Sequence, residues 1–177
     1  IMVGEIRDSE TAAIAVQAGL TGHLVISTIH SGSTAGVFAR LINMEIEPFL
    51  LASSITGVLG LRLIRRNCVY CSVPYEPEHS MLRMLSPEQL EVAQFRRGTG
   101  CDHCMNTGFA GRTALTEMLV VDEVIRDSVL QKLPTRSLQQ IAVQQGMVNL
   151  WQMGVQRVLR GETTLEEILR VVAADQM

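Results

Sequence analysis

The sequence predicts an α/β protein, and three observations support that class. Apolar, β-branched runs alternate with helical patterns in the first third of the chain, a cysteine-bearing and loop-rich segment follows, and the remainder has helical periodicity. Alternation of strand, helix, strand and helix is typical of a parallel sheet covered by helices. Since the chain has 177 residues and 47% of them are hydrophobic, we expect a buried core rather than disorder.

The first third supplies the alternation. Residues 1–6 are predicted to be a short apolar strand, and residues 9–20 a helix with a mostly apolar surface. The β-branched run at 23–29 predicts a second, buried strand. Two more helices are predicted, over 33–42 and from Pro48 to about Arg65, because proline suits a first helical turn.

The middle segment, residues 67–112, has a different composition. It contains all four cysteines and three of the five prolines, which predicts a small module made mostly of loops. Ser86, Pro87 and Gln89 have the spacing of a capped helix start, so one helix is predicted there. A loop-rich segment of this size buries little apolar surface and needs an additional cross-link to fold.

The last segment is predicted to be helical from Asp122 onward. Thr163 and Glu166 have capping-box spacing at the start of the final helix. The predicted helices cover residues 137–145, 149–160 and 163–173. The whole sequence therefore divides into three predicted parts, residues 1–66, 67–112 and 113–177.

Composition excludes several classes of protein. A net charge of -3 argues against a surface built mainly for nucleic acid or anionic lipid. No run of 18 apolar residues is present, so a transmembrane helix is not expected. The single lysine, Lys132, is followed by Leu133, which excludes a Walker A phosphate loop in this sequence. The chain also opens inside the apolar run at Ile1, and we expect an N-terminal portion to be missing.

The four cysteines form two C-x-x-C pairs. Cys68 and Cys71 are separated from Cys101 and Cys104 by a 29-residue spacer. Two such knuckles can place four thiolates tetrahedrally around zinc, and the bound metal would stabilise the loop-rich module directly. The spacer is longer than in common zinc ribbons, but the composition of the module favours a structural zinc site.

Other roles for these cysteines are disfavoured. No secretory signal is visible, which argues against disulfides, because cytosolic thiols stay reduced. A redox-active pair usually occurs singly, at the start of a helix in a thioredoxin-like fold. His103 lies within the second knuckle and His79 lies in the spacer, so either remains a possible ligand, although four cysteines already complete a closed site.

Polar residues end the two predicted strands. Glu5 follows the first strand and His30 ends the second, so a parallel sheet would bring both to one edge, where α/β proteins bind ligands. In nucleotide hydrolases an acid there orients the attacking water or holds the water shell of magnesium. A histidine there can donate a hydrogen bond to a terminal phosphate. The simpler alternative is that Glu5 caps the next helix.

Four stretches of the sequence occur in an order that matches one known family. They resemble the Walker B region, the histidine box, the helix leading into the metal-binding subdomain and the second cysteine knuckle of secretion-type motor ATPases. The stretches are GEIRDSETA at 4–12 after its apolar run, LTGHLVISTIH at 20–30, IEPFLLASSITGVLGLRLIRRNC at 46–68 and CDHCMNTGFAGRTALTEML at 101–119.

The resemblance implies the C-terminal half of a RecA-like P-loop NTPase core, a small zinc-binding subdomain and a helical C-terminal subdomain. It implies a homo-hexamer on the cytoplasmic face of the inner membrane that hydrolyses ATP, with Mg²⁺, to drive assembly of a type II secretion pseudopilus or a type IV pilus. Inner-membrane platform proteins would be its partners. Retraction motors of the superfamily generally lack the four cysteines, which favours assembly.

The resemblance also implies roles for individual residues. Glu5 matches the catalytic Walker B glutamate. His30 matches the second histidine-box position, near the γ-phosphate, and His23 matches the first. All four cysteines match the zinc ligands. Gly4 occupies the usual Walker B aspartate position, so magnesium is expected to be held indirectly. The Walker A loop and the arginine-supplying N-terminal domain are absent from the sequence, and the isolated chain is therefore expected to be inactive.

Two other classes of function compete with the motor ATPase. One is a zinc-ribbon module that binds nucleic acid. Nucleic-acid binding is disfavoured, because the module lacks a stripe of aromatic and basic residues and carries glutamates at 76, 78, 88 and 91. The other is a structural adaptor whose hydrolase half has decayed. An intact phosphate loop upstream would exclude that adaptor.

Overall fold

The computed structural model describes residues 1–172 and divides them into two compact units. The first unit consists of residues 1–60 and 117–148. The second unit consists of residues 61–116 and the described residues from Asn149 onward. These units divide the chain differently from the three predicted parts, because residues 117–148 return to the first unit.

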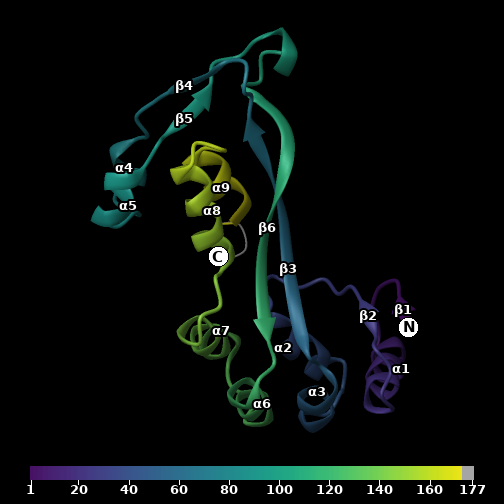
Figure 1. Cartoon of the computed structure of the whole chain (residues 1–177). Coiled ribbons are helices and arrows are strands. Elements are labelled where there is room, and N and C mark those ends of the chain that lie inside the picture. The colour runs from purple at the N-terminus through teal and green to yellow at the C-terminus, as the bar shows by residue number, and fades with distance from the viewer. Residues whose placement is uncertain (173–177) are drawn as a thin grey trace. The chain divides into compact units, whose positions relative to one another are not determined.

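The first unit contains the predicted alternation of strands and helices (Figure 1). Strands β1 and β2 are parallel neighbours, and five helices accompany them. The elements are β1 (Met2–Val3), α1 (Ser9–Leu20), β2 (Ile26–Ser27), α2 (Gly36–Asn43), α3 (Pro48–Ser54), α6 (Glu123–Leu130) and α7 (Thr135–Gln144). The two predicted strands are real but much shorter than expected, whereas the helix over 9–20 is confirmed residue for residue. The prediction that the second strand is buried was wrong, because Ile26 is 56% exposed.

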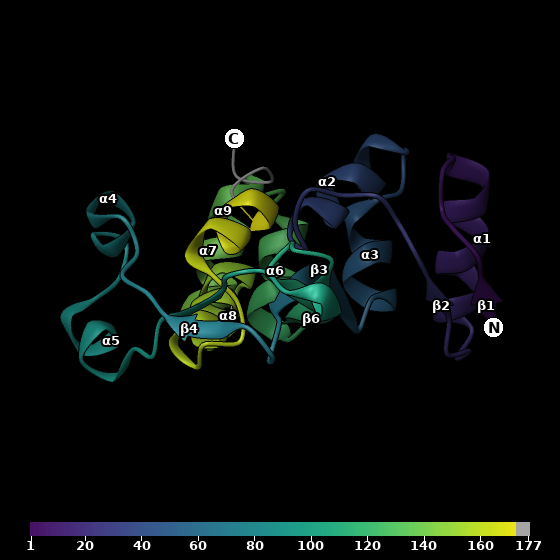
Figure 2. The same ribbon diagram turned by 90° about the horizontal axis from the view of Figure 1, so that it is seen from above.

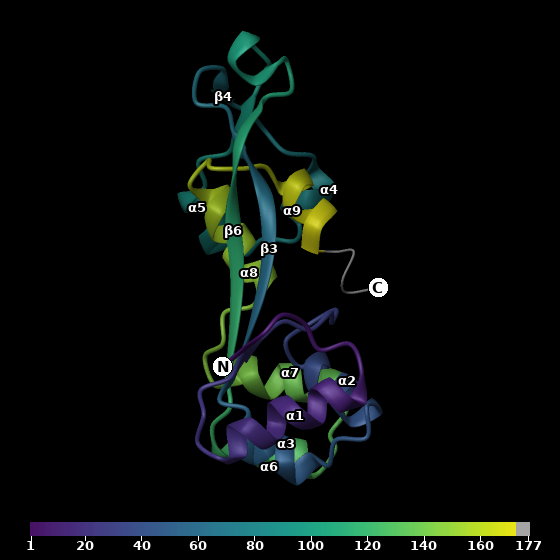
Figure 3. The same ribbon diagram turned by 90° about the vertical axis from the view of Figure 1, so that its right-hand side faces the viewer.

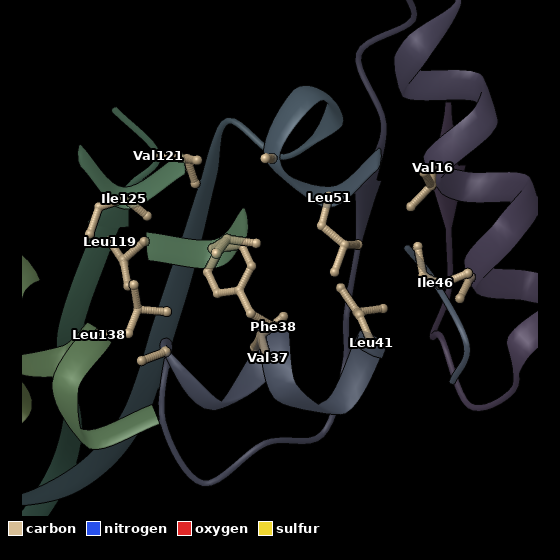
Figure 4. Close-up of a cluster of buried hydrophobic side chains, with 14 of the residues drawn as sticks. Val16, Val37, Phe38, Leu41, Ile46, Leu51, Leu119, Val121, Ile125 and Leu138 are labelled. Atoms are coloured by element: carbon tan, nitrogen blue, oxygen red, sulfur yellow. The ribbon is translucent and has the colours of Figure 1, made fainter. Parts of the chain in front are cut away.

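A single apolar core holds the first unit together. Helix α3 packs against α1 and α6, and α7 contacts α2 and α6 (Figure 3). Phe38, Leu51, Leu119 and Ile125 are nearly or completely buried, and their side chains lie within one cluster (Figure 4). Each fully buried side chain of this size stabilises the fold by roughly 1.5–3 kcal/mol relative to an exposed position.

The second unit contains the cysteine segment and the last two helices. It comprises β4 (Ser72–Pro74), α4 (His79–Leu82), α5 (Pro87–Val92), β5 (Arg96–Gly98), a 3₁₀ turn η1 (Asp102–Cys104), α8 (Leu150–Leu159) and α9 (Leu165–Val172). Strands β4 and β5 pair antiparallel, and α4 and α5 lie on the segment that joins them (Figure 2). Helices α8 and α9 contact each other and bury Val155, Val158, Leu165 and Ile168.

Two long strands, β3 (Gly57–Asn67) and β6 (Phe109–Val120), pair with each other, and each contributes residues to both units. The prediction of one helix from Pro48 to Arg65 was therefore wrong beyond Ser54. Leu59, Leu61 and Leu63 are exposed while Ile64 is fully buried, which is the two-residue alternation of a strand. A short apolar run fits either structure by periodicity, and pairing with β6 decides between them.

One of the two capping boxes predicted from the sequence is confirmed. Ser86 and Gln89 form the predicted capping box of α5, because each side chain bonds the backbone N–H of the other residue. Asn149 caps α8 in the same way. The predicted box at Thr163 and Glu166 was wrong by one residue: the Thr164 hydroxyl accepts the N–H of Glu167. The Thr163 hydroxyl donates instead to the carbonyl of Arg65 at 2.9 Å. The predicted end of the last helix, Ala173, lies outside the described residues.

A buried carboxylate joins β3 to α9 within the second unit. Glu167 is 1% exposed and accepts hydrogen bonds from Arg65 at 2.6 Å and from Arg170 at 2.6 Å. The backbone N–H of Arg65 also donates to it at 2.9 Å. Burial opposes ionisation of Glu167, but hydrogen bonds from Arg170 and Arg65 outweigh that effect and lower its pKa to about 2.

We predict that Glu167→Gln lowers the free energy of unfolding of the second unit by about 2 kcal/mol at neutral pH. This is less than the loss expected for a fully buried ion pair, because Arg65 and Arg170 are partly exposed and solvent screens their charges. The folded-state pKa of Glu167 is depressed, so its contribution is present above the unfolded value of 4.5 and is lost as pH falls toward about 2. Urea unfolding followed by the fluorescence of Trp151, the one tryptophan, measures this difference across pH. Exposed Glu91→Gln is the control, and equal stability losses for both variants would contradict the assignment.

Candidate functional site

The parallel pairing of β1 and β2 aligns the two strand ends. Met2 pairs with Ile26 and Val3 with Ser27. Beyond the strands the alignment continues, because the Ile6 N–H donates to the Thr28 carbonyl at 2.8 Å. The Thr28 hydroxyl also donates to the carbonyl of Gly4 at 2.8 Å. The residues that follow the two strands therefore lie at one edge of the sheet.

Glu5 and His30 meet at this edge. His30 Nε2 lies 3.3 Å from Glu5 Oε1. The Glu5 side chain is mostly covered, with 21% of it exposed, whereas 90% of the His30 side chain is exposed. The expectation that a parallel sheet brings these two residues together is met in the structure.

Arg7 is a third member of the site, which sequence reasoning did not single out. Its Nε donates to Glu5 Oε2 at 2.6 Å, and its Nη2 lies 2.5 Å from the same oxygen. The hydrogen bond from Arg7 is the main cause of a lowered pKa for Glu5, and the positive charges of Arg7 and Arg40 act in the same direction. The sequence contained a signal for this ion pair, since Arg7 lies two residues after Glu5 in GEIRD.

Asp8, not Glu5, caps the first helix. Asp8 is the N-cap of α1, and its Oδ1 accepts the backbone N–H of Thr11 at 2.8 Å. That backbone hydrogen bond is the main cause of a lowered pKa for Asp8. The helix-capping role considered for Glu5 is therefore performed by Asp8. The Glu5 carboxylate contacts Arg7 and His30 instead.

His23 lies apart from this group. It follows the turn that ends α1, is exposed, and has its Nδ1 3.2 Å from the Thr21 hydroxyl. It precedes β2, whereas Glu5 and His30 follow the carboxyl ends of their strands. The structure thus brings together two of the three predicted nucleotide-site residues, and His23 is not one of them.

The four cysteines converge within the second unit. Their Sγ atoms all lie within 4.8 Å of one another. Three of the separations are 3.8 Å for Cys68 to Cys101, 3.9 Å for Cys71 to Cys104 and 3.7 Å for Cys101 to Cys104. A regular tetrahedron with Zn–S bonds of about 2.3 Å has S–S edges of about 3.8 Å. A disulfide would need about 2.05 Å, so the arrangement fits a four-thiolate metal site and not paired disulfides.

Backbone groups prepare two of these sulfurs to carry negative charge. The N–H groups of Cys101 and Gly108 donate to Cys104 Sγ at 3.2 and 3.3 Å, and the N–H of Gly100 donates to Cys71 Sγ at 3.3 Å. Burial opposes ionisation of Cys104, but the backbone donors outweigh it and lower its pKa to about 6. Such N–H···S contacts stabilise thiolates, the form in which cysteine binds a metal.

A close backbone approach brings the two knuckles together. A Cβ atom on Gly98 would lie 2.0 Å from the carbonyl oxygen of Gly108, so no larger residue fits there. Next to this contact, the Cys68 N–H donates to the Gly108 carbonyl at 2.9 Å. The glycines of the module therefore let β5 and the start of β6 approach closely enough for the cysteines to meet.

The histidines near the knuckles are engaged elsewhere or lie outside the sulfur cluster. The His103 ring stacks on Tyr70, with centroids 4.0 Å apart. His79 begins helix α4 and is exposed. Within the described part of the chain, the group of potential ligands at this position consists of the four cysteines alone.

Comparison with known proteins shows the family. A family model described as "Type II/IV secretion system protein" matches residues 1–170, which is nearly the whole chain. The chain belongs to this family. The chain spans 19% of the length of one curated member of the family and 35% of the length of another.

The first of these members of the type II/IV secretion system family is the type IV pilus assembly ATPase PilB of Thermus thermophilus, 45% identical over 171 residues, or 96% of this chain. The second is the putative type II secretion system protein E of Escherichia coli, 42% identical over 176 residues, or 98% of this chain. The prediction of a secretion or pilus ATPase family is confirmed.

Solved structures confirm the α/β fold class. The ATPase DotB of Legionella pneumophila superposes with a TM-score of 0.64 at 22% identity, over 98% of this chain and 38% of DotB. The pilus retraction motor PilT with bound ADP gives a TM-score of 0.63 at 21% identity, over 96% of this chain and 38% of PilT. This type II/IV secretion system protein therefore has the fold of part of those ATPases. Among residues 1–172, no helix is long and apolar enough to cross a membrane.

Proposed function

We propose that this chain is the part of a motor ATPase that carries the catalytic glutamate and a structural zinc module. In the complete protein, Glu5 orients the water that attacks the γ-phosphate of ATP, and His30 contacts that phosphate. The observation that carries the proposal is the 3.3 Å contact between His30 Nε2 and Glu5 Oε1 at the carboxyl edge of a parallel sheet. Membership of a family that includes the assembly ATPase PilB supports it.

The complete protein would act as a homo-hexamer at the cytoplasmic face of the inner membrane. It would couple ATP turnover, with Mg²⁺, to assembly of a pilus or pseudopilus through inner-membrane platform proteins. Its phosphate loop would come from sequence that this chain does not contain, since Lys132-Leu133 cannot serve as a Walker A motif. His23, the other histidine-box position, would be brought to the nucleotide only by a rearrangement of the turn that precedes β2.

The four cysteines would hold one Zn²⁺ in a closed tetrahedral site. The matching sulfur separations and the N–H···S hydrogen bonds support zinc in particular, because thiolate sets of this geometry are typical of structural zinc. The zinc would stabilise the 67–112 module rather than take part in phosphate chemistry. A nucleic-acid-binding role is disfavoured, because the chain has a net charge of -3.

His30→Ala tests the nucleotide role of the sheet edge. In the full-length ATPase, this variant is expected to bind ADP normally but to lose about tenfold in affinity for ATP, the effect of removing one hydrogen bond to a charged group. Titration with both nucleotides measures the two affinities, and His79→Ala, in the second unit, is the matched control. A full-length protein that neither binds nor hydrolyses ATP would exclude the motor function and leave the structural adaptor.

A further inference from the structure

Both carboxylate oxygens of Glu5 already have a cationic or polar partner. Arg7 holds Oε2 through two nitrogens, at 2.6 and 2.5 Å, and His30 approaches Oε1 at 3.3 Å. A carboxylate that orients and activates water needs a free oxygen for that water. In this arrangement, Arg7 takes both acceptor sites of Oε2 and His30 lies beside Oε1, so the proposed catalytic glutamate faces its own neighbours.

Arg7 is free to change partners. Its side chain is 77% exposed, and in the described part of the chain its hydrogen bonds and ion pair involve Glu5 only. Two of the three guanidinium nitrogens are in use, so one edge of the planar group remains available. The Arg7 end of this ion pair is exposed although Glu5 is mostly covered, so water can replace the Arg7 contact at small cost.

A terminal phosphate is a stronger partner for Arg7 than Glu5 is. It offers three acceptor oxygens and about two negative charges, and guanidinium groups prefer such bidentate contacts. His30, which is 90% exposed, can move toward the same group. A phosphate that arrives at this sheet edge therefore competes directly for both partners of Glu5.

We propose that Arg7 is a positioning residue that holds Glu5 in the nucleotide-free state and moves to the terminal phosphate when a nucleoside triphosphate binds. The transfer releases the Glu5 carboxylate to orient the attacking water. A nucleoside diphosphate has no terminal phosphate at that position and leaves Arg7 on Glu5. The site thereby becomes competent only when its substrate is present. This inference rests on the nucleotide site proposed above.

Binding measurements on the full-length ATPase test this transfer. The probes are ADP and adenylyl imidodiphosphate, an ATP analogue that keeps a terminal phosphate group and is not hydrolysed. In Arg7→Gln, we expect the affinity for the analogue to fall by about tenfold or more relative to the affinity for ADP. Arg7→Lys should retain part of the preference for the analogue over ADP, because lysine keeps the positive charge but lacks the planar guanidinium group.

Arg126→Gln is the matched control, since Arg126 is an exposed arginine of α6 in the same unit. It should leave the ratio of the two affinities unchanged. A purely structural role for Arg7 would alter thermal unfolding, which we expect to stay constant. If Arg7→Gln keeps the wild-type ratio of analogue affinity to ADP affinity, Arg7 does not contact the terminal phosphate and the proposal is overturned.

A double-mutant cycle tests the release step. Glu5→Gln frees Arg7, so it should tighten analogue binding more in the wild-type background than in the Arg7→Gln background. Equal tightening in both backgrounds would show that Arg7 does not hold Glu5, and it would overturn the release. Failure of the wild-type protein to bind either nucleotide would instead exclude the proposed function, so the two failures are distinguishable.

Discussion

Replacing Glu5 with Gln in the full-length ATPase is expected to lower ATP turnover by about 100-fold or more, the usual contribution of a positioned acid or base. The amide keeps the shape of the side chain but loses the charge that orients and polarises the attacking water. ATP binding should be retained, because the phosphate loop proposed for the complete protein would supply most of the contact with the phosphates. Steady-state turnover and nucleotide affinity measure the two effects separately.

The matched control is Asp8→Asn, a nearby carboxylate that caps α1 through Thr11 and has no assigned role in catalysis. It should change the stability of α1 slightly and leave turnover near wild type. Near-normal turnover in Glu5→Gln would remove Glu5 from the mechanism. Loss of folding in that variant would instead show that Glu5 is structural.

Removing the proposed zinc ion is expected to unfold the 67–112 module. Cys101→Ser should abolish binding of the proposed zinc ion, because oxygen is a poor replacement for one of four thiolates around such an ion. Since bound zinc supplies folding free energy directly, the module should lose its structure while the first unit keeps α1 and α3. Metal analysis and amide hydrogen exchange of the same samples measure both outcomes.

The histidines near the knuckles provide the controls for the zinc site. His103→Ala removes a ring that stacks on Tyr70, and His79→Ala removes an exposed residue, so both variants should retain one zinc. Loss of zinc from His103→Ala would reopen its role as a ligand. A reduced wild-type protein without zinc would exclude the metal site altogether.

Features that depend on near neighbours along the chain can be predicted from the sequence alone. The predicted capping box at Ser86 joins residues three apart, and each C-x-x-C pair lies within four residues. The family and the fold class could also be predicted, because four motifs occur in one order. Even the meeting of Glu5 with His30 followed from strand order, since parallel neighbours must end at one edge.

Features that depend on distant partners could not be predicted from the sequence and are fixed by the folded chain. The run from Gly57 to Asn67 was predicted as helix and forms a strand, because its partner β6 lies more than 40 residues further along the chain. Thr34 donates to buried Glu117 at 2.5 Å across 83 residues, and Arg65 meets Glu167 across 102. Sequence periodicity indicates which faces are apolar. It does not indicate which distant segment will supply the hydrogen-bond partners of a backbone or the counter-charge of a side chain. Those pairings are chosen by burial and hydrogen bonding in the folded chain, and they determined where β3 and α9 lie within their units.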